Sequence, residues 1–472
     1  MYQVITFVSA LLTIVLSLLI FKNKSEKSFS TFLKVLTVIY CVMGLFRFML
    51  SDSFVNVIHH GGFYTDQVWY EGFDPLQTIL RWGYYIGYSV IPMAVFFKNR
   101  FFRNIMSYIV LPFAILSAVF FNGYMVYFLD PKGRGLDLIP WIRYTYFIVE
   151  LTLAISIPVL LQIKDKHIIN VKDKKELIYF LVGIPLIFLQ VMPVYTPQSL
   201  FGYTSLSIHI PWLILIVIET AVLYYYFRFK NYETRYQLVV FLTLVLFYHY
   251  NSLFLMGFTL PRLPIQLCNL AAYVYMFTVI FKSRKAFNFC YTVNMVGTLI
   301  AILGPDFVGG PLGFWCIHYM FEHMLVFIVP VLCAGLRIFP RIQKDGLKHM
   351  FVGYVIYFVF CMVSGILINA YAANVATRVN YFYIFDLKKA MSYVPFIKIV
   401  DILPITINGY TFYPLLMVVI FVGFLLLCFI WYWATKKLFV MNDDHFELRK
   451  ARIDLYEKIT GKQSKALREY PD

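Results

Sequence analysis

About thirteen stretches of mostly apolar residues, each about twenty residues long, run through this chain and limit what it can fold into. Each stretch is long enough to cross the hydrocarbon core of a bilayer as an α-helix. Hydrophobic residues make up 61% of the chain and charged residues only 14%, whereas average soluble domains carry about 25% charged residues. The pattern therefore predicts an all-α, polytopic membrane helix bundle and excludes a soluble globular protein. The predicted spans are 3–21, 32–50, 76–97, 104–128, 140–163, 177–194, 208–227, 236–257, 264–281, 286–303, 314–336, 349–370 and 412–435.

Lys and Arg residues gather in every second connection between these spans, and this predicts how the chain is oriented. The basic connections are 22–34, 98–103, 164–175, 228–235, 282–285, 337–348 and the tail after residue 436. Because basic loops stay in the cytoplasm, the N-terminus is expected outside and the C-terminus in the cytoplasm. The formal net charge of +16 is then a topology signal, so nucleic acid is not expected as a partner. We expect a multi-pass protein of a bacterial cell membrane.

The two halves of the chain show an internal repeat. Residues 147–160 align without gaps with residues 319–332, and Glu150 and Glu322 share the same register. Spans 2–7 would then match spans 8–13 with the same orientation, because each copy has an even number of spans. The predicted organisation is an extra N-terminal helix in 1–30, a degenerate six-helix repeat in 31–230, a second repeat with the site in 231–437, and a cytoplasmic tail helix in 438–472.

Ionisable residues inside the predicted spans are costly in lipid and mark positions of function or of pairing. Arg47 is expected to snorkel towards the acidic outer loop that follows it. Glu150 is expected to pair with Arg143 or with an arginine of a neighbouring helix. Glu219 has no evident partner in the sequence.

Cys268 and His323 form the candidate catalytic pair. Cys268 lies about five residues into its span and His323 about ten residues into its own, and both spans enter from the outer side. At 1.5 Å per residue these depths are roughly 7 and 15 Å, so the two side chains can meet in the outer half of the bilayer. A thiol is a poor nucleophile until it is deprotonated, and a neighbouring imidazole is the usual base.

Two plainer interpretations stay open. A cysteine in an apolar chain is most often a small core residue, and we assign to packing Cys41, Cys290, Cys316, Cys333, Cys361 and Cys428. A histidine in a span often hydrogen-bonds a neighbouring helix. No metal is expected, because His318 and His323 have the wrong spacing for two ligands on one helix face. No cofactor is expected either, since the sequence has no phosphate-binding glycine loop.

Four short motifs in the second half resemble the YwaF-like family of integral membrane proteins, which includes the transmembrane protein 164 relatives of eukaryotes. They follow the family's order over roughly residues 236–435. The motifs are Leu263-Pro-Ile-Gln-Leu-Cys268, Gly297-Thr-Leu-Ile-Ala-Ile-Leu-Gly-Pro305-Asp306, the His323 span ending in Val329-Pro330-Val331, and Asn380-Tyr381-Phe-Tyr383-Ile. One position departs from the family pattern, because Gln266 stands where many relatives have histidine.

The resemblance implies a cysteine-dependent phospholipid acyltransferase, with Cys268 as the acyl-accepting nucleophile and His323 as its base. Membrane phospholipids are then the expected substrates, and no protein partner is predicted. The expected substrate-binding residues are Gln266, Asn269, Asp306, His318, Asn380, Tyr381 and Tyr383.

A transporter or lipid-handling scaffold without acyl chemistry is the alternative function. Many transporters are built from tandem repeats that share one orientation, and the predicted duplication has this layout. In that case the thiol of Cys268 only packs, and the intramembrane carboxyls of Glu150 and Glu219 carry the function.

Overall fold

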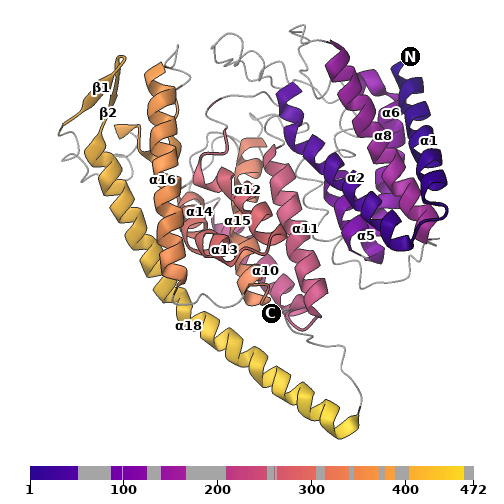
Figure 1. Cartoon of the computed structure of the whole chain (residues 1–472). Helices are drawn as coiled ribbons and strands as arrows, with labels where there is room; N and C mark the ends of the chain where they lie inside the picture. The colour runs from indigo at the N-terminus through magenta and orange to yellow at the C-terminus, as the bar shows by residue number, and fades with distance from the viewer. Residues whose placement is uncertain are drawn as a thin grey trace. The chain divides into compact units, whose positions relative to one another are not determined.

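The chain, described from a computed structural model, is built almost entirely of helices (Figure 1). The structure describes residues 1–50, 87–97, 99–124, 140–165, 209–251, 260, 263–304, 314–339, 345–371, 378–387 and 403–461, and the predicted span 177–194 lies outside them. Within these ranges, nine helices are long and apolar enough to cross a membrane, and two shorter apolar helices accompany them. The all-α, multi-pass membrane bundle is therefore confirmed, whereas the count of thirteen spans is not.

The first of two compact units contains Met1–Gly202, Tyr248–Thr259 and Leu312–His318. α8 is its central helix, because α1, α2 and α6 all pack against it. The helices are α1 (Tyr2–Phe21), α2 (Glu26–Phe46), Gly87–Phe96, α5 (Arg100–Ile105), α6 (Leu111–Val119) and α8 (Pro140–Asp165).

A buried ion pair joins the end of α2 to α8 in this unit. Arg47 Nη2 lies 2.5 Å from Glu150 Oε2, and both side chains are only 1% exposed. Arg47 also donates to the Tyr124 hydroxyl at 2.9 Å, and the Tyr88 hydroxyl donates to the second carboxylate oxygen. The expected pairing of Glu150 with an arginine of a neighbouring helix is thus confirmed. The expectation that Arg47 snorkels to the outer loop is wrong, because a buried carboxylate compensates its charge inside the bundle.

The second unit contains Tyr203–Phe247, Leu260–Pro311 and Tyr319–Asp472. Its core is aromatic where α16 meets α18: the rings of Tyr354 and Phe421 stack at 5.0 Å. Gly365 in α16 lets Phe385 approach the backbone, since a Cβ there would lie 2.1 Å from the ring. The helices are α10 (His209–Phe227), α11 (Tyr232–Asn251), α12 (Leu267–Ile280), α13 (Arg284–Phe289), α14 (Met295–Leu303), α15 (Phe314–Gly335), α16 (Gly346–Tyr371) and α18 (Pro414–Thr460).

Both units contain the same succession of elements around a π-helical turn. A six-residue helix, a five-residue π-helical turn and a nine-residue helix follow one another as α5, Met106–Val110 and α6. The same three lengths recur as α13, Cys290–Asn294 and α14. A long helix with an internal proline comes next in each unit, α8 with Pro158 and α15 with Pro330. The matching lengths support the predicted duplication, while its outer boundaries stay predictions.

A short β-hairpin precedes α18 and was not predicted from the sequence. β1 (Ile405–Ile407) pairs antiparallel with β2 (Tyr410–Phe412). Asn408 and Gly409 between them both have positive φ, 48° and 75°. Asn-Gly is the strongest short hairpin signal, because both positions of this turn need positive φ. The signal is therefore present in the sequence, within the outer connection 371–411.

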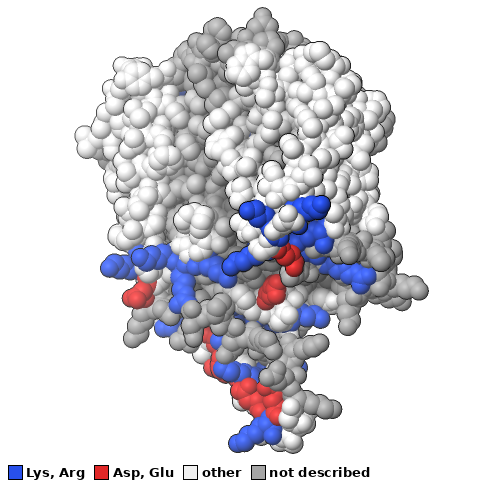
Figure 2. All heavy atoms as spheres, turned by 45° about the vertical axis from the view of Figure 1, so that its right-hand side comes forward, with Lys and Arg blue, Asp and Glu red and all other residues white. Residues whose placement is uncertain are grey.

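Basic side chains gather at one end of the helices of the second unit. Figure 2 shows Lys and Arg in a band below a wide stretch of uncharged described surface, with a mixed-charge extension beyond it. In the second unit, a basic residue follows the end of each of three helices: Arg228 follows α10, Lys282 follows α12, and Arg337 follows α15. We call this end of the second unit the basic end.

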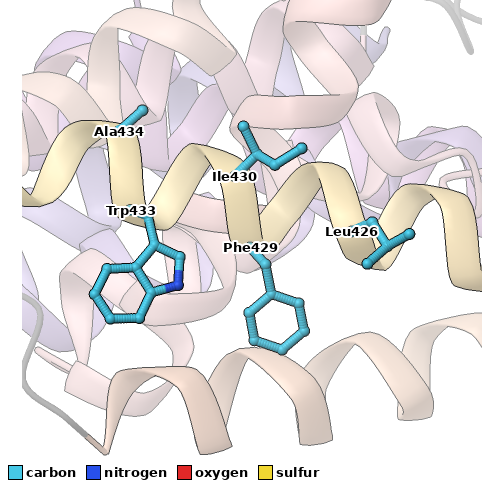
Figure 3. Close-up of a pocket in the computed structure, with 5 residues that line it drawn as sticks. All are labelled: Leu426, Phe429, Ile430, Trp433 and Ala434. Carbon is cyan, nitrogen blue, oxygen red and sulfur yellow. The ribbon is translucent and has the colours of Figure 1, made fainter.

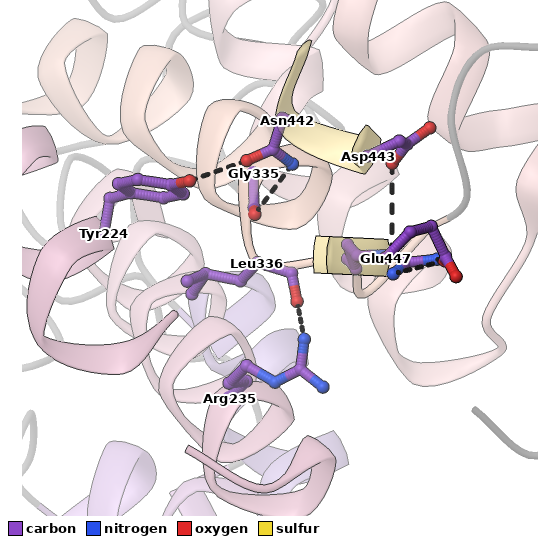
Figure 4. A network of polar contacts seen from close by, with 8 residues as sticks. Tyr224, Arg235, Gly335, Leu336, Asn442, Asp443 and Glu447 are labelled. Carbon is purple, nitrogen blue, oxygen red and sulfur yellow. Dashed lines mark hydrogen bonds and ion pairs between the residues drawn. The ribbon is translucent and has the colours of Figure 1, made fainter. Parts of the chain in front are cut away.

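Polar contacts tie α18 to the basic end (Figure 4). Asn442 accepts from the Tyr224 hydroxyl at 2.6 Å and donates to the Gly335 carbonyl at 3.2 Å. Arg337 pairs with Glu447 at 3.2 Å and with Asp443 at 3.9 Å. The tail helix predicted from residue 438 is therefore a continuation of α18, which docks on the bundle before it extends to Thr460.

Glu150→Gln is expected to lower the free energy of unfolding by about 3–5 kcal/mol, because it leaves the guanidinium of Arg47 buried without its counter-charge. Denaturant unfolding in detergent, followed by near-UV circular dichroism, measures the change. Arg337→Ala is the control, since its ion pairs are partly exposed and such pairs contribute less than about 1 kcal/mol. Equal effects of the two variants would contradict a structural role for the buried pair.

Candidate functional site

The candidate nucleophile lies at the very start of α12. Gln266 has extended backbone angles, φ −58° and ψ 143°, and its carbonyl accepts the hydrogen bond of Leu270 at 2.8 Å. Cys268 is thus the second residue of the helix, and its thiol donates to Oδ1 of Asn269 at 3.2 Å. The side chain of Cys268 is partly exposed, whereas five of the other six cysteines are buried. Cys268 and Cys41 are therefore the two partly exposed cysteines among the seven.

The side chain of Gln266 holds the segment that follows α16. Its amide Nε2 donates to the carbonyl of Asn380 at 2.9 Å, and its Oε1 accepts from the backbone N–H of Phe382 at 2.9 Å. Asn369 of α16 makes a second clamp of the same kind, bonding both the N–H and the carbonyl of Val379 at 2.7 and 2.9 Å. Two amide side chains therefore fix the backbone between Val379 and Phe382.

The Asn380–Tyr383 motif is brought against the segment before Cys268. The Tyr381 hydroxyl donates to the Leu260 carbonyl at 2.5 Å, and Oδ1 of Asn380 accepts from the N–H of Phe385 at 3.0 Å. Phe382 and Tyr383 both have positive φ, 55° and 58°. Such angles are costly for residues with a Cβ and persist only where the surroundings hold them. Burial raises the pKa of the Tyr381 hydroxyl above its ordinary value.

The helix α14 packs under the start of α12. Nδ2 of Asn294 donates to the Leu267 carbonyl at 2.8 Å. A Cβ on Gly297 would lie 2.5 Å from Cδ2 of Leu267, so only glycine permits this approach. Three of the four family-like motifs therefore meet around α12. Asp306, at the end of the second motif, lies outside the described residues.

His323 is buried in the middle of α15 with a fixed ring orientation. Its Nδ1 lies 2.6 Å from the Tyr319 carbonyl, and its ring stacks on the Tyr319 ring at 4.0 Å. Because a carbonyl only accepts, Nδ1 carries the proton, and in the neutral ring Nε2 then holds the lone pair. Nε2 is buried and has no hydrogen-bond partner among the described residues. This nitrogen can therefore accept a proton.

Four contacts give the register of α12 and α15 in the second unit. Leu267 lies beside Gly297 and Thr278 beside Cys290, so α12 runs antiparallel to α14 and the turn before it. The Tyr319 hydroxyl bonds the Ala301 carbonyl, and the Tyr275 hydroxyl bonds the Val326 carbonyl. α15 is thus parallel to α12.

The same register places Cys268 at the level of one turn of α15. Cys268 lies about two helical turns before Tyr275, and Tyr319 lies about two turns before Val326. Because the Tyr275–Val326 contact joins the two helices, Cys268 is level with the turn from Tyr319 to His323. The hydrogen bonds of the described residues do not join its sulfur to the imidazole of His323.

Glu322, which the sequence analysis did not include among the site residues, is buried in α15 next to His323 in the chain. Its alignment with Glu150 in the internal repeat is the sequence feature that could have identified it. His318 belongs to the first unit, where its ring stacks on that of His249 at 4.2 Å. No group of three or more His, Cys, Asp and Glu side chains forms a metal site in the part of the chain that the structure describes.

Two apolar hollows lie elsewhere in the second unit. A groove of about 680 Å³ runs along α18, where Phe429 and Trp433 project from the same side (Figure 3). The ammonium of Lys436 lies 4.8 Å from the Trp433 ring, at one end of this groove. A second hollow of about 370 Å³ lies between α10, α15 and α18, beside Tyr224 and Asn442. Neither hollow is lined by Cys268 or His323.

The comparisons with known proteins find one similarity. Residues 200–432 match the TMEM164 family. The matched region contains all four family-like motifs, three of which meet around α12. No curated protein and no solved structure matches the chain.

Gln266→Leu is expected to release the clamp on residues 379–382, because it leaves the Asn380 carbonyl and the Phe382 N–H without partners. Each unsatisfied buried group costs roughly 1–3 kcal/mol, so amide hydrogen exchange at Phe382 is expected to quicken at least about tenfold. Exchange mass spectrometry of the detergent-solubilised protein measures it. Gln3→Leu is the control, since its hydrogen bond is exposed. Unchanged protection at Phe382 would argue against the clamp.

Proposed function

The second half of this chain belongs to the TMEM164 family, and on that premise we propose that the protein is a membrane acyltransferase that moves a fatty-acyl chain between phospholipids. Cys268 carries the chain as a thioester, and His323 acts as general base. The observation that carries the proposal is that a partly exposed thiol lies level with the turn of α15 that holds a buried imidazole with an open Nε2.

The proposed transfer has two balanced halves. In the first, the sulfur of Cys268 attacks the ester carbonyl carbon of a donor phospholipid, the C–S bond forms and the bond to the glycerol oxygen breaks. The thiol proton ends on that oxygen, which leaves as the hydroxyl of a lysophospholipid. In the second, the hydroxyl of an acceptor lysophospholipid attacks the thioester, and its proton returns to the sulfur. Imidazole is suited to carry these protons because a neutral ring has one nitrogen that donates and one that accepts.

The site residues divide into three proposed roles. Gln266 and Asn380 bond the backbone around α12, so we assign them to holding the site rather than to contacting lipid. Asn269 bonds the thiol and is proposed to orient it. Tyr381, Tyr383 and Asp306 stay proposed contacts of the substrate, whereas His318 belongs to the first unit and is not assigned to this site. The substrates are membrane phospholipids, and the proposed setting is the outer half of a bacterial cell membrane.

The first unit is proposed to be a degenerate copy that serves packing and shape. Its α5–α6 segment repeats the lengths of α13–α14, yet its repeated glutamate, Glu150, is tied to Arg47. The same duplication favours the second candidate function, a transporter or lipid-handling scaffold. The two functions differ in what they require of Cys268.

Cys268→Ser is expected to abolish the acyl adduct and acyl transfer, because a hydroxyl at this position is a far weaker nucleophile. The purified protein in vesicles is given a phospholipid with a labelled acyl chain and a lysophospholipid, and intact-protein mass and labelled lipid are measured. His323→Gln is expected to slow transfer roughly 100-fold or more. Cys41→Ser is the control, since Cys41 is likewise partly exposed but lies in the first unit.

Transfer by folded Cys268→Ser at the wild-type rate would reject the enzyme and favour the transporter or scaffold. A transporter is expected to tolerate this substitution and to lose its function when Glu219 is neutralised.

A further inference from the structure

We infer that Glu322 is a second proton acceptor at the sulfur of Cys268, acting beside His323. The inference rests on the proposed acyl transfer and adds a residue and a division of labour to it. Glu322 takes the thiol proton when the thioester forms, and His323 takes the hydroxyl proton of the acceptor lipid.

The helix faces direct Glu322 towards α12. In α12, Cys268 and Tyr275 are seven residues apart and lie within about 20° of each other around the helix axis. In α15, Glu322 lies about 40° from Val326, on the side of the helix that Tyr275 contacts at 2.8 Å. The faces that carry Cys268 and Glu322 are therefore turned towards each other at similar depth.

The surroundings of Glu322 agree with this placement. Glu322 is 3% exposed, so its carboxyl lies inside the bundle. A carboxyl buried inside a membrane bundle is costly and marks a functional position by default. The facing helix, α12, carries the thiol of Cys268.

The internal repeat supplies an independent argument. Glu150, the counterpart of Glu322, is neutralised by Arg47 and accepts the Tyr88 hydroxyl. In the second unit, Glu322 occupies the aligned position in α15. The aligned glutamates are thus buried in both units, and in the second unit the glutamate lies on the side of α15 that Tyr275 of α12 contacts.

Two acceptors suit a reaction with two proton transfers. The carboxylate of Glu322 takes the thiol proton as sulfur attacks the donor ester, and the resulting acid protonates the departing glycerol oxygen. Nε2 of His323 then takes the proton of the acceptor hydroxyl as it attacks the thioester, and returns it to the sulfur. Each half ends with both bases restored, so no further reactant is needed.

The test separates the two halves of the reaction in the full-length protein in vesicles. With a labelled donor phospholipid alone, the growth of the acyl adduct on intact protein gives the acylation rate. Adding lysophospholipid then gives the rate at which the adduct disappears. Glu322→Gln is expected to slow acylation roughly 100-fold and the second step less than about threefold. His323→Gln is expected to show the opposite pattern.

Glu219→Gln is the matched control, since it neutralises another intramembrane carboxyl of the same unit and is expected to leave both rates unchanged. Glu322→Asp keeps the charge one methylene away and is expected to acylate about tenfold slower than wild type. It carries the test by itself if Glu322→Gln does not fold. Wild-type acylation in either Glu322 variant overturns the inference while the thioester mechanism stands. Wild-type protein that forms no adduct at all overturns the proposed function instead.

Discussion

The position of Cys268 depends on how the backbone before α12 satisfies its hydrogen bonds inside a membrane bundle. Non-helical backbone at membrane depth is tolerated only where protein groups replace the missing helical partners. Side chains from three other elements do so here: Tyr357 and Cys361 of α16 donate to the Ile265 carbonyl, Asn294 to that of Leu267, and Tyr381 to that of Leu260. The thiol is thus held by a network that reaches well beyond its own helix.

This network explains why a substitution at Gln266 keeps the local fold. A side-chain amide offers one donor and one acceptor on adjacent atoms, and Gln266 uses both on the backbone at Asn380 and Phe382. A neutral histidine also offers one donor and one acceptor, although on opposite sides of a ring. Glutamine at this position therefore changes how the 379–382 segment is held, and it leaves the proposed proton carriers, His323 and Glu322, in place.

The sequence predicted the helices of the bundle, which depend on long apolar runs. It predicted few of the features that depend on single side-chain contacts. Apolar runs gave the helices of the bundle, because twenty apolar residues have few other solutions in a chain this apolar. The Gln266 clamp and the π-helical turns could not be foreseen, since each is decided by tertiary contacts rather than by periodicity. The Asn408-Gly409 hairpin could have been foreseen from its dipeptide. The sequence predicted that the partner of Glu150 is an arginine. Only the packing of α2 against α8 in the structure identifies this arginine as Arg47.

The two units hold the aligned residues Glu150 and Glu322 among different neighbours. In the first unit the α8 carboxylate has a guanidinium at 2.5 Å and a tyrosine hydroxyl as hydrogen-bond donors, and such a fully compensated charge has little capacity to accept a proton. In the second unit the α15 carboxyl of Glu322 is likewise buried, and it is the proposed acceptor of the thiol proton. The elements that precede α8 and α15 have the same lengths. The surroundings of the two glutamates therefore differ in the side chains that the neighbouring helices supply. A duplicated membrane bundle can in this way keep one copy for stability while the partners of the other copy change, because the cost of a buried charge is met separately in each unit.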